Sequence, residues 1–159
     1  MSSRIDYKRL QGLIPTTAQS LLAISAAVTA GGLEPSLIHL IKTRASQING
    51  CAFCLHMHTA EARAAGETDD RLHLLNAWRE APAYTERERA ALAWTEALTL
   101  IADGHAPDDV FETARAQFSE KELALLTSEI VAINAWNRIA IAYRFAPAVA
   151  APAPLAKRA

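Results

Sequence analysis

The sequence predicts an all-α protein, a compact bundle of six or seven helices. Three observations support this prediction. Apolar residues recur at helical spacing along nearly the whole chain, and no alternating pattern typical of strands competes with it. With 159 residues, 51% of them hydrophobic and 21% charged, the chain is long and apolar enough to bury one core. Capping residues, prolines and glycines divide it into helical segments.

Three helices are expected in the first half of the chain. The first begins at residue 16 or 17 and ends before Gly31-Gly32. The second begins with Pro35, which suits a first helical turn, and ends at Asn49-Gly50, because both residues tolerate the left-handed conformation that ends helices. The third is expected over residues 51–66, where a glycine again ends the helix.

The second half carries clear helix starts. Thr68 is expected to cap a short helix with two aspartates in its first turn. Residues 85–88 and 119–122 are capping boxes that open two long helices, the first closed by Gly104 and the second ending before Pro147. Between them, another short helix starts at residue 107.

Domain organisation and charge exclude several classes of protein. Residues 1–145 are expected to form one domain and the Ala/Pro-rich residues 146–159 a flexible tail. The net charge of −1, without a basic stripe, argues against a nucleic-acid partner. The N-terminus has no apolar secretory segment, and polar residues interrupt the apolar run 123–145, which indicates a core helix and not a membrane span. A cytoplasmic location is therefore expected. We also expect a homo-oligomer, because the helices carry more apolar surface than one bundle core needs.

Both cysteines of the chain, and two of its five histidines, lie in SQINGCAFCLHMHTAEARAAG. Successive residues of a helix are rotated by about 100°, so Cys51, Cys54 and His58 share one face, while His56 points away. Cys54 and His58, four residues apart, can touch. In a reducing compartment, an isolated Cys-X-X-Cys pair is more often catalytic or metal-binding than structural.

These side chains are typical of thiol redox chemistry. The first turn of a helix stabilises a thiolate at Cys51, and the spacing allows a reversible disulfide. His58 can take the proton of Cys54. The helix terminus favours Cys51 as the attacking sulfur, whereas the nearby base favours Cys54. A general base contributes about 10²–10⁴ in rate and a helix dipole only about 0.3–1 kcal/mol. We therefore predict that Cys54 attacks an oxidant and that Cys51 then closes the disulfide.

The cysteine pair has two other interpretations. Free cysteines are often small apolar core residues. Cys-X-X-Cys with a histidine also supplies three zinc ligands, but structural zinc sites usually draw on two separated segments and the chain has no second cysteine pair. We expect neither a metal nor a flavin, haem or nucleotide cofactor, and we expect His56 to be a surface residue.

The segment RASQINGCAFCLHMHTAEARAAGE, followed by LLNAWREAP, TERERAALAWTEALTLI and AINAWNRIAIAYR, resembles the alkylhydroperoxidase AhpD-like group of the carboxymuconolactone decarboxylase superfamily. The resemblance runs from about Leu33 to Arg144. It implies an all-α fold that assembles into trimers or hexamers, and a thiol-dependent peroxidase activity. Carried over by position, it implies that Cys54 is peroxidatic, Cys51 resolving and His58 part of a proton relay.

The chain departs from the family pattern at two positions. Phe53 stands where the pattern has a histidine, and His39 stands where it has the relay glutamate. His39 could act as a second base, although a structural histidine is the expected role at that position. The chain therefore needs another carboxylate if the relay is complete.

Glu96, a lone acid in the helical segment AWTEALTL, is the carboxylate that we predict for the relay. A carboxylate in such a setting needs a hydrogen bond or a charge partner, which His58 would provide. The alternative is that Glu96 bonds a threonine or an arginine, Arg44 or Arg138.

The predicted function is reduction of alkyl hydroperoxides or hydrogen peroxide, with an external dithiol as electron donor. Two alternatives come from other classes. A cofactor-free lactone decarboxylase, from the same superfamily, would have no use for two thiols. A zinc-stabilised or redox-sensing interaction module would use the cysteines without catalysis.

Overall fold

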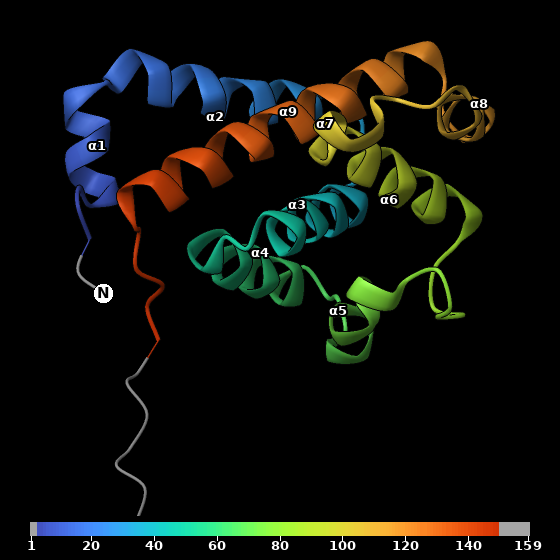
Figure 1. The fold of residues 1–159 in the computed structure, drawn as a ribbon, viewed down its shortest axis with the longest axis horizontal. Coiled ribbons are helices and arrows are strands. Elements are labelled where there is room, and N and C mark those ends of the chain that lie inside the picture. Colours follow the sequence, from blue (N-terminus) through green and yellow to red (C-terminus); the bar gives the residue numbers. More distant parts are fainter. Residues whose placement is uncertain (1–2, 150–159) are drawn as a thin grey trace, which may run out of the picture.

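The structure, a computed structural model, describes residues 3–149 and is all α-helical over that range, which confirms the predicted fold class (Figure 1). One 3₁₀ turn follows α5 (Leu75–Ala77). In chain order the helices are α1 (Tyr7–Leu13), α2 (Pro15–Ala30), α3 (Pro35–Asn49), α4 (Ala52–Ala64), α5 (Asp69–Leu74), α6 (Glu86–Thr99), α7 (Ile101–Gly104), α8 (Asp108–Gln117) and α9 (Glu120–Tyr143).

The described residues form nine α-helices, more than the six or seven expected. The additional α1 has 7 residues and one buried side chain, Leu10, so it carries no apolar stripe that a periodicity could reveal. The long helix expected over residues 85–104 ends at Thr99, because Leu100 leaves the helical region at φ −99° and ψ 32°, and α7 follows as a separate turn.

Both predicted capping boxes are present. Thr85 Oγ1 accepts a hydrogen bond from the backbone N–H of Glu88, and the Glu88 carboxylate accepts one from the backbone N–H of Thr85 at 2.8 Å. Ser119 and Glu122 form the same reciprocal pair at the start of α9. Thr68 caps α5 as expected. These starts depend on neighbouring residues only, which is why the sequence locates them.

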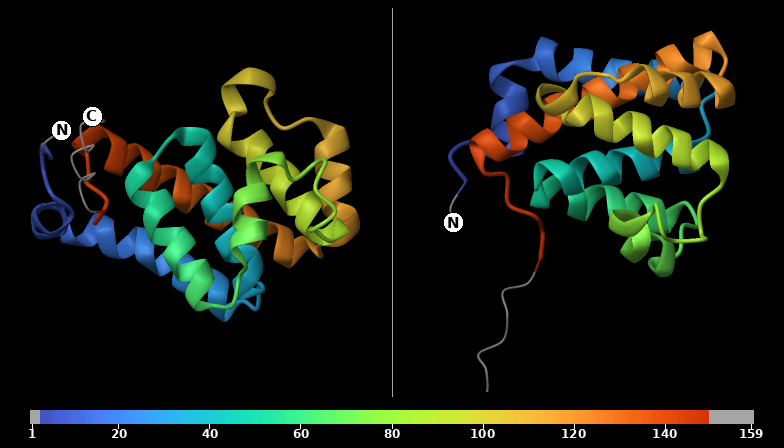
Figure 2. Two further views of the ribbon diagram at one scale, coloured as in Figure 1. Left: turned by 90° about the horizontal axis from the view of Figure 1, so that it is seen from below. Right: turned by 45° about the vertical axis from the view of Figure 1, so that its right-hand side comes forward.

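Helix α9 is the central element of the bundle. It lies between α2 on one side and α3 on the other, and α3 carries α4 on its outer side (Figure 1 and Figure 2). Helix α6 packs against α3 and α9 and holds α8. The main core fills the space between these helices, with Ile41, Leu126 and Ile130 fully buried. The long apolar segment is thus a core helix, as expected.

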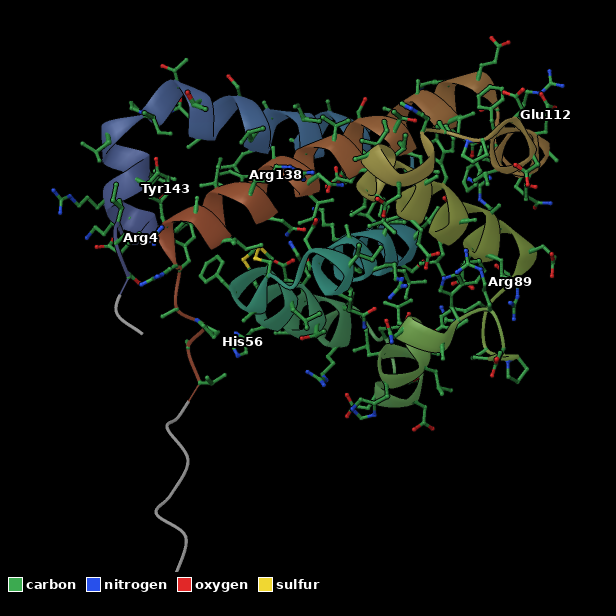
Figure 3. The ribbon with its side chains drawn as sticks, viewed as in Figure 1. Arg4, His56, Arg89, Glu112, Arg138 and Tyr143 are labelled. Carbon is green, nitrogen blue, oxygen red and sulfur yellow. A yellow bond between two sulfur atoms is a disulfide. The ribbon has the colours of Figure 1, made fainter. Side chains whose placement is uncertain are left out.

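The N-terminal segment lies against the C-terminal end of α9. The backbone N–H of Arg4 donates to the carbonyl of Tyr143 at 2.9 Å, and both residues lie at the same corner of the molecule (Figure 3). This contact holds α1 beside the ends of α4 and α9, where the two cysteines lie.

Within residues 3–149, no single helix combines the length and apolar character needed to cross a membrane. Helices α1 and α2 reach that length and apolar character only as a pair, and the pair is bent by 109°. The flexible tail predicted over residues 146–159 lies mostly outside the described residues. The division into a domain and a tail therefore stays a prediction.

Candidate functional site

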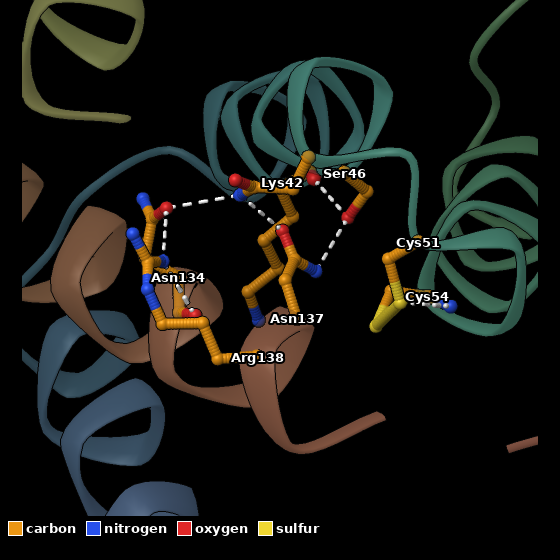
Figure 4. Close-up of a disulfide and its surroundings, with 8 residues drawn as sticks. Lys42, Ser46, Cys51, Cys54, Asn134, Asn137 and Arg138 are labelled. Carbon is orange, nitrogen blue, oxygen red and sulfur yellow. Dashed lines mark hydrogen bonds between the residues drawn. A yellow bond between two sulfur atoms is a disulfide. The ribbon is translucent and has the colours of Figure 1, made fainter. Parts of the chain in front are cut away.

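The two cysteines lie where α3 ends and α4 begins. Gly50 adopts the left-handed conformation, φ 68° and ψ 30°, that ends α3. That conformation costs a residue with a side chain roughly 1–2 kcal/mol. Cys51 then occupies the N-cap of α4, and its sulfur accepts a hydrogen bond from the backbone N–H of Cys54 at 3.3 Å. The two sulfurs form a disulfide with Cα atoms 5.4 Å apart (Figure 4).

Apolar residues from two distant segments, α1 and the C-terminal end of α9 with the residues after it, surround the disulfide. Leu10, Ala140 and Phe145 pack with the two cysteines into one buried cluster. Tyr7 and Phe53 extend it: their ring centroids are 5.9 Å apart, and Phe53 meets Phe145 edge-on at 5.3 Å. Because Tyr7 and Leu10 come from α1, a helix that the sequence did not reveal forms part of the wall of the site.

A buried hydrogen-bond network ties the segment before Cys51 to α9. Asn49 Nδ2 donates to Oδ1 of Asn134 and of Asn137, each at 2.9 Å. Asn137 Nδ2 donates to Ser46 Oγ at 3.1 Å (Figure 4). Asn137 is fully buried, so its amide depends on these partners. The network thereby fixes the end of α3, and the turn that carries the disulfide, against α9.

Replacing Asn137 with alanine is expected to lower the free energy of unfolding by about 1–3 kcal/mol, because it removes two hydrogen bonds in a buried network. Urea unfolding of the variant measures the change. Ser128→Ala is the matched control, since Ser128 is exposed on the same helix and bonds only to its own helix backbone. Its expected change is within about 0.5 kcal/mol, and an equal loss in both variants would contradict the role of the network.

His58 lies one turn after Cys54 on α4 and is 5% exposed. Its Nδ1 is 2.8 Å from Glu61 Oε2. This hydrogen bond is the main reason that the pKa of Glu61 lies below its ordinary value; burial opposes the shift and the charge of Lys42 supports it. A carboxylate only accepts, so His58 donates its Nδ1–H, and in the neutral form of the ring Nε2 is the nitrogen that can accept a proton. Glu61 is not among the predicted site residues, although its spacing of three residues from His58 is a signal for such a pair.

A cavity of about 270 Å³ lies beside Cys54. Helix α4 contributes Cys54, His58 and Glu61 to its wall, whereas Cys51 is not among the described residues that line it. The volume is close to the lower end, about 300 Å³, of the usual range for small-molecule sites. Most of the remaining wall is apolar or aromatic, formed by Tyr7, Leu22, Phe53, Met57, Ile133, Trp136, Ala140 and Phe145.

A second carboxylate, Glu129, also lines this cavity and is fully buried. Its Oε1 accepts a hydrogen bond from Ser25 Oγ at 2.8 Å and pairs with Lys42 Nζ at 2.9 Å. The three residues come from α2, α3 and α9. In the sequence, Glu129 is visible only as an interruption of an apolar run, and nothing local indicates that Ser25 and Lys42 meet it.

Glu96 lies outside the lining of this cavity. Its Oε1 accepts hydrogen bonds from Arg44 Nε at 2.8 Å and Trp78 Nε1 at 2.7 Å, and its Oε2 pairs with Arg79 at 2.5 Å. Burial raises the pKa of Glu96, but the bonds from Trp78 and Arg79 and the charge of Arg44 outweigh it and hold the pKa below its ordinary value. Glu96 therefore binds Arg44, the arginine expected if Glu96 is not part of the relay. The carboxylate that contacts His58 is Glu61.

The other histidines of interest lie apart from the cavity. His39 is half-buried on α3, its Nδ1 has no hydrogen-bond partner within the described part of the chain, and burial lowers its pKa. His56 is exposed on α4, as expected (Figure 3). Across residues 3–149, no group of three or more His, Cys, Asp and Glu side chains is arranged to hold a metal ion.

Comparisons with known proteins give a family match over much of the chain. The model of the Carboxymuconolactone decarboxylase family matches residues 15–97. The uncharacterized protein YdfG of Bacillus subtilis strain 168 is 37% identical over 142 residues, which cover 89% of this chain and 95% of the relative.

Solved structures share the fold. A protein of unknown function from Agrobacterium tumefaciens, provisionally named antioxidant defence protein AhpD, superposes with a TM-score of 0.87 at 47% identity, covering 94% of this chain and 100% of that chain. The debrominase Bmp8 superposes with a TM-score of 0.77 at 20% identity, covering 86% of this chain and 74% of that chain. At this identity, the likeness to the debrominase concerns the fold alone.

Proposed function

The chain belongs to the carboxymuconolactone decarboxylase family, and from this premise we propose that it is a thiol-dependent peroxidase acting on alkyl hydroperoxides or hydrogen peroxide. One observation carries the proposal: Cys54, which is bonded to Cys51, shares the wall of a small-molecule-sized cavity with the imidazole of His58. Because Cys54 lines the cavity, we assign it as the sulfur that attacks the peroxide and Cys51 as the resolving sulfur.

The proposed cycle begins with both cysteines reduced. The Cys54 thiolate attacks one oxygen of the hydroperoxide, the O–O bond breaks, and the sulfur becomes a sulfenic acid. The alkoxide leaves and takes up a proton to become an alcohol. The Cys51 thiol then attacks the sulfenic sulfur, the S–S bond forms and water is released. The two thiols have supplied the two electrons that reduce the peroxide.

His58 is the proton carrier in this proposal. Its Nε2 takes the proton of the Cys54 thiol and returns one to the leaving alkoxide. Glu61, bonded to Nδ1 at 2.8 Å, fixes the ring orientation and stabilises the imidazolium that forms. Glu61 thus takes the place in the relay that was predicted for Glu96, because it is the carboxylate in contact with His58.

The cycle uses an external dithiol as electron donor and no bound cofactor. The dithiol reduces the Cys51–Cys54 disulfide by exchange and is itself oxidised. Such donors stay reduced in the cytoplasm, where we therefore place the protein. Its net charge of −1 gives no reason to add a nucleic-acid partner.

Consumption of cumene hydroperoxide with dithiothreitol as donor tests the proposal. The expected rate rises in proportion to protein concentration, above the rate of dithiothreitol alone. The matched control is protein that has been reduced, alkylated with iodoacetamide and freed of excess reagent before the assay, which should show only the background rate. A parallel assay with hydrogen peroxide separates the two substrate classes, and a rate independent of protein for both peroxides would contradict the proposal.

We also propose that the protein is a homo-oligomer, a trimer or hexamer. Exposed apolar side chains on the long helices support this, since Leu22, Val131 and Ile141 are 47%, 57% and 46% exposed. Light scattering coupled to size exclusion at micromolar concentration should give three or six times the chain mass of 17.2 kDa. A monodisperse monomer would contradict the proposal.

A further inference from the structure

Glu129 is a buried carboxylate that the proposed peroxidase cycle does not use. Its side chain is 0% exposed, and the residue lines the same cavity as Cys54. Ser25 Oγ and Lys42 Nζ both hold Oε1, at 2.8 and 2.9 Å. Its Oε2 is also buried and has no hydrogen-bond partner among the described residues.

An unpartnered oxygen on a buried carboxylate calls for a donor. Leaving such an oxygen without a hydrogen bond is destabilising, and native proteins satisfy nearly all buried polar groups. The two side chains that bond the carboxylate, Ser25 and Lys42, both contact Oε1 and leave Oε2 without a donor. Because Glu129 lies in a cavity wall, the missing donor can come from a molecule that enters the cavity, and Oε2 is the atom left to receive it.

The face of α9 that lines the cavity carries Glu129 about three turns away from Ala140, the residue of that face that packs with the reactive sulfur. Glu129, Ile133, Trp136 and Ala140 are spaced by four, three and four residues, so they form one helical stripe. Ala140 packs in the cluster that contains Cys54. At 1.5 Å per residue, Glu129 lies about 16 Å along the helix from Ala140 and about 10 Å from Trp136. The cavity thus has a sulfur end with aromatic walls and a carboxylate end.

We propose that Glu129 is a substrate-binding residue whose Oε2 accepts a hydrogen bond from a hydroxyl group of the ligand. The charges favour a neutral donor over an ammonium group. Glu129 and Lys42 already neutralise each other at 2.9 Å, so a cationic ligand would add a buried charge without a counter-ion of its own. A hydroxyl satisfies Oε2 and leaves this balance unchanged.

The substrate class follows, and this step rests on the proposed peroxidase function. The hydroperoxide group must reach Cys54, while the hydroxyl group binds Glu129. The preferred substrate is therefore a neutral organic hydroperoxide with an apolar or aromatic body and a separate hydroxyl group at its far end. Plain hydrogen peroxide would use the sulfur end alone.

Binding of two matched ligands to the oxidised protein tests the site without any redox chemistry. 4-Phenylbutan-2-ol and 4-phenylbutan-2-one have the same heavy-atom skeleton, but only the alcohol carries a donor. We expect isothermal titration calorimetry to show that the wild-type protein binds the alcohol about tenfold more tightly than the ketone, since the ketone places an acceptor against Oε2 and leaves both unpaired.

The variant Glu129→Gln should remove this preference. Ser25 and Lys42 are donors, so the amide oxygen takes the place of Oε1 and the amide NH₂ takes the place of Oε2. The cavity then presents a donor, which binds the ketone and the alcohol alike, and the tenfold ratio should fall to about one. Glu120→Gln, at an exposed position in the first turn of α9, is the matched control and should keep the wild-type ratio.

Each outcome decides the matter. Equal affinities in the wild-type protein, no binding of either ligand at millimolar concentration, or an unchanged ratio in E129Q would overturn the assignment. Far-UV circular dichroism establishes that E129Q is folded; should it fail to fold, the wild-type ratio decides alone. Selective binding of the alcohol without peroxide consumption would support the Glu129 site and contradict the peroxidase proposal. Peroxide consumption without selective binding would support the peroxidase proposal and contradict the Glu129 site.

Discussion

Replacing Cys54 with serine should reduce hydroperoxide consumption to the rate of dithiothreitol alone, a loss of the order of 10³-fold or more. The serine hydroxyl fills nearly the same volume in the cavity wall, but it does not ionise near neutral pH and cannot be oxidised to a sulfenic acid. The buried cluster around the disulfide should therefore keep its packing while the reaction loses its nucleophile. The measurement is the initial rate with cumene hydroperoxide at fixed protein and donor concentrations.

Cys51→Ser is the matched variant, because both sulfurs belong to the same disulfide and both residues are 2% exposed. It should keep the first step and lose the second, so that one equivalent of peroxide is consumed rapidly and Cys54 accumulates as a sulfenic acid. Trapping with dimedone followed by mass spectrometry would place the adduct on Cys54. Rapid single turnover in Cys54→Ser, with the adduct on Cys51, would exchange the two roles.

Replacing His58 with glutamine should slow the oxidation of Cys54 by about 10²–10⁴-fold near neutral pH, because the thiol loses its general base. Glutamine can still donate a hydrogen bond to Glu61, so the local structure of α4 should be retained. The rate is best measured in the Cys51→Ser background, in which only the first step occurs. His56→Gln, at an exposed position on the same helix, is the matched control and should be unaffected.

The pH dependence separates a base from a structural residue. A thiol needs no general base once the pH exceeds its own pKa, and for an ordinary cysteine that pKa is near 8.5. The deficit of the His58→Gln variant should therefore shrink as the pH rises toward that range. A deficit of the same size at every pH would indicate that His58 only supports the packing of the site, and the relay would have to be abandoned.

Features that depend on residues close together in the chain could be predicted from the sequence. The capping boxes at Thr85 and Ser119 and the stop at Gly50 are set within one helical turn, so local rules locate them. The placement of Cys54 and His58 on one face of one helix follows from the same regularity, because their four-residue spacing is nearly one turn.

Features that depend on contacts between distant segments could not be predicted. Glu96 and Glu129 look alike in the sequence, since each is a lone acid in an apolar helical segment. Glu96 meets Arg44 and Arg79, whereas Glu129 meets Ser25 and Lys42 beside the cavity. Helical periodicity predicts on which face of its helix a residue lies, but it does not predict which residues of another helix pack against that face.

The sequence by itself determined the helical class, the capped helix starts at Thr68, Thr85 and Ser119, the stop at Gly50, the family and the Cys-Cys-His constellation, because each is expressed over a few residues or one helix. Only the tertiary structure decided that Cys54 is the sulfur at the cavity, that α1 supplies part of its wall, and which carboxylates face it. Those features arise where α1, α2, α3, α4 and α9 meet. The positions of helices relative to one another are set by the packing of the whole core, which no single segment of the chain encodes.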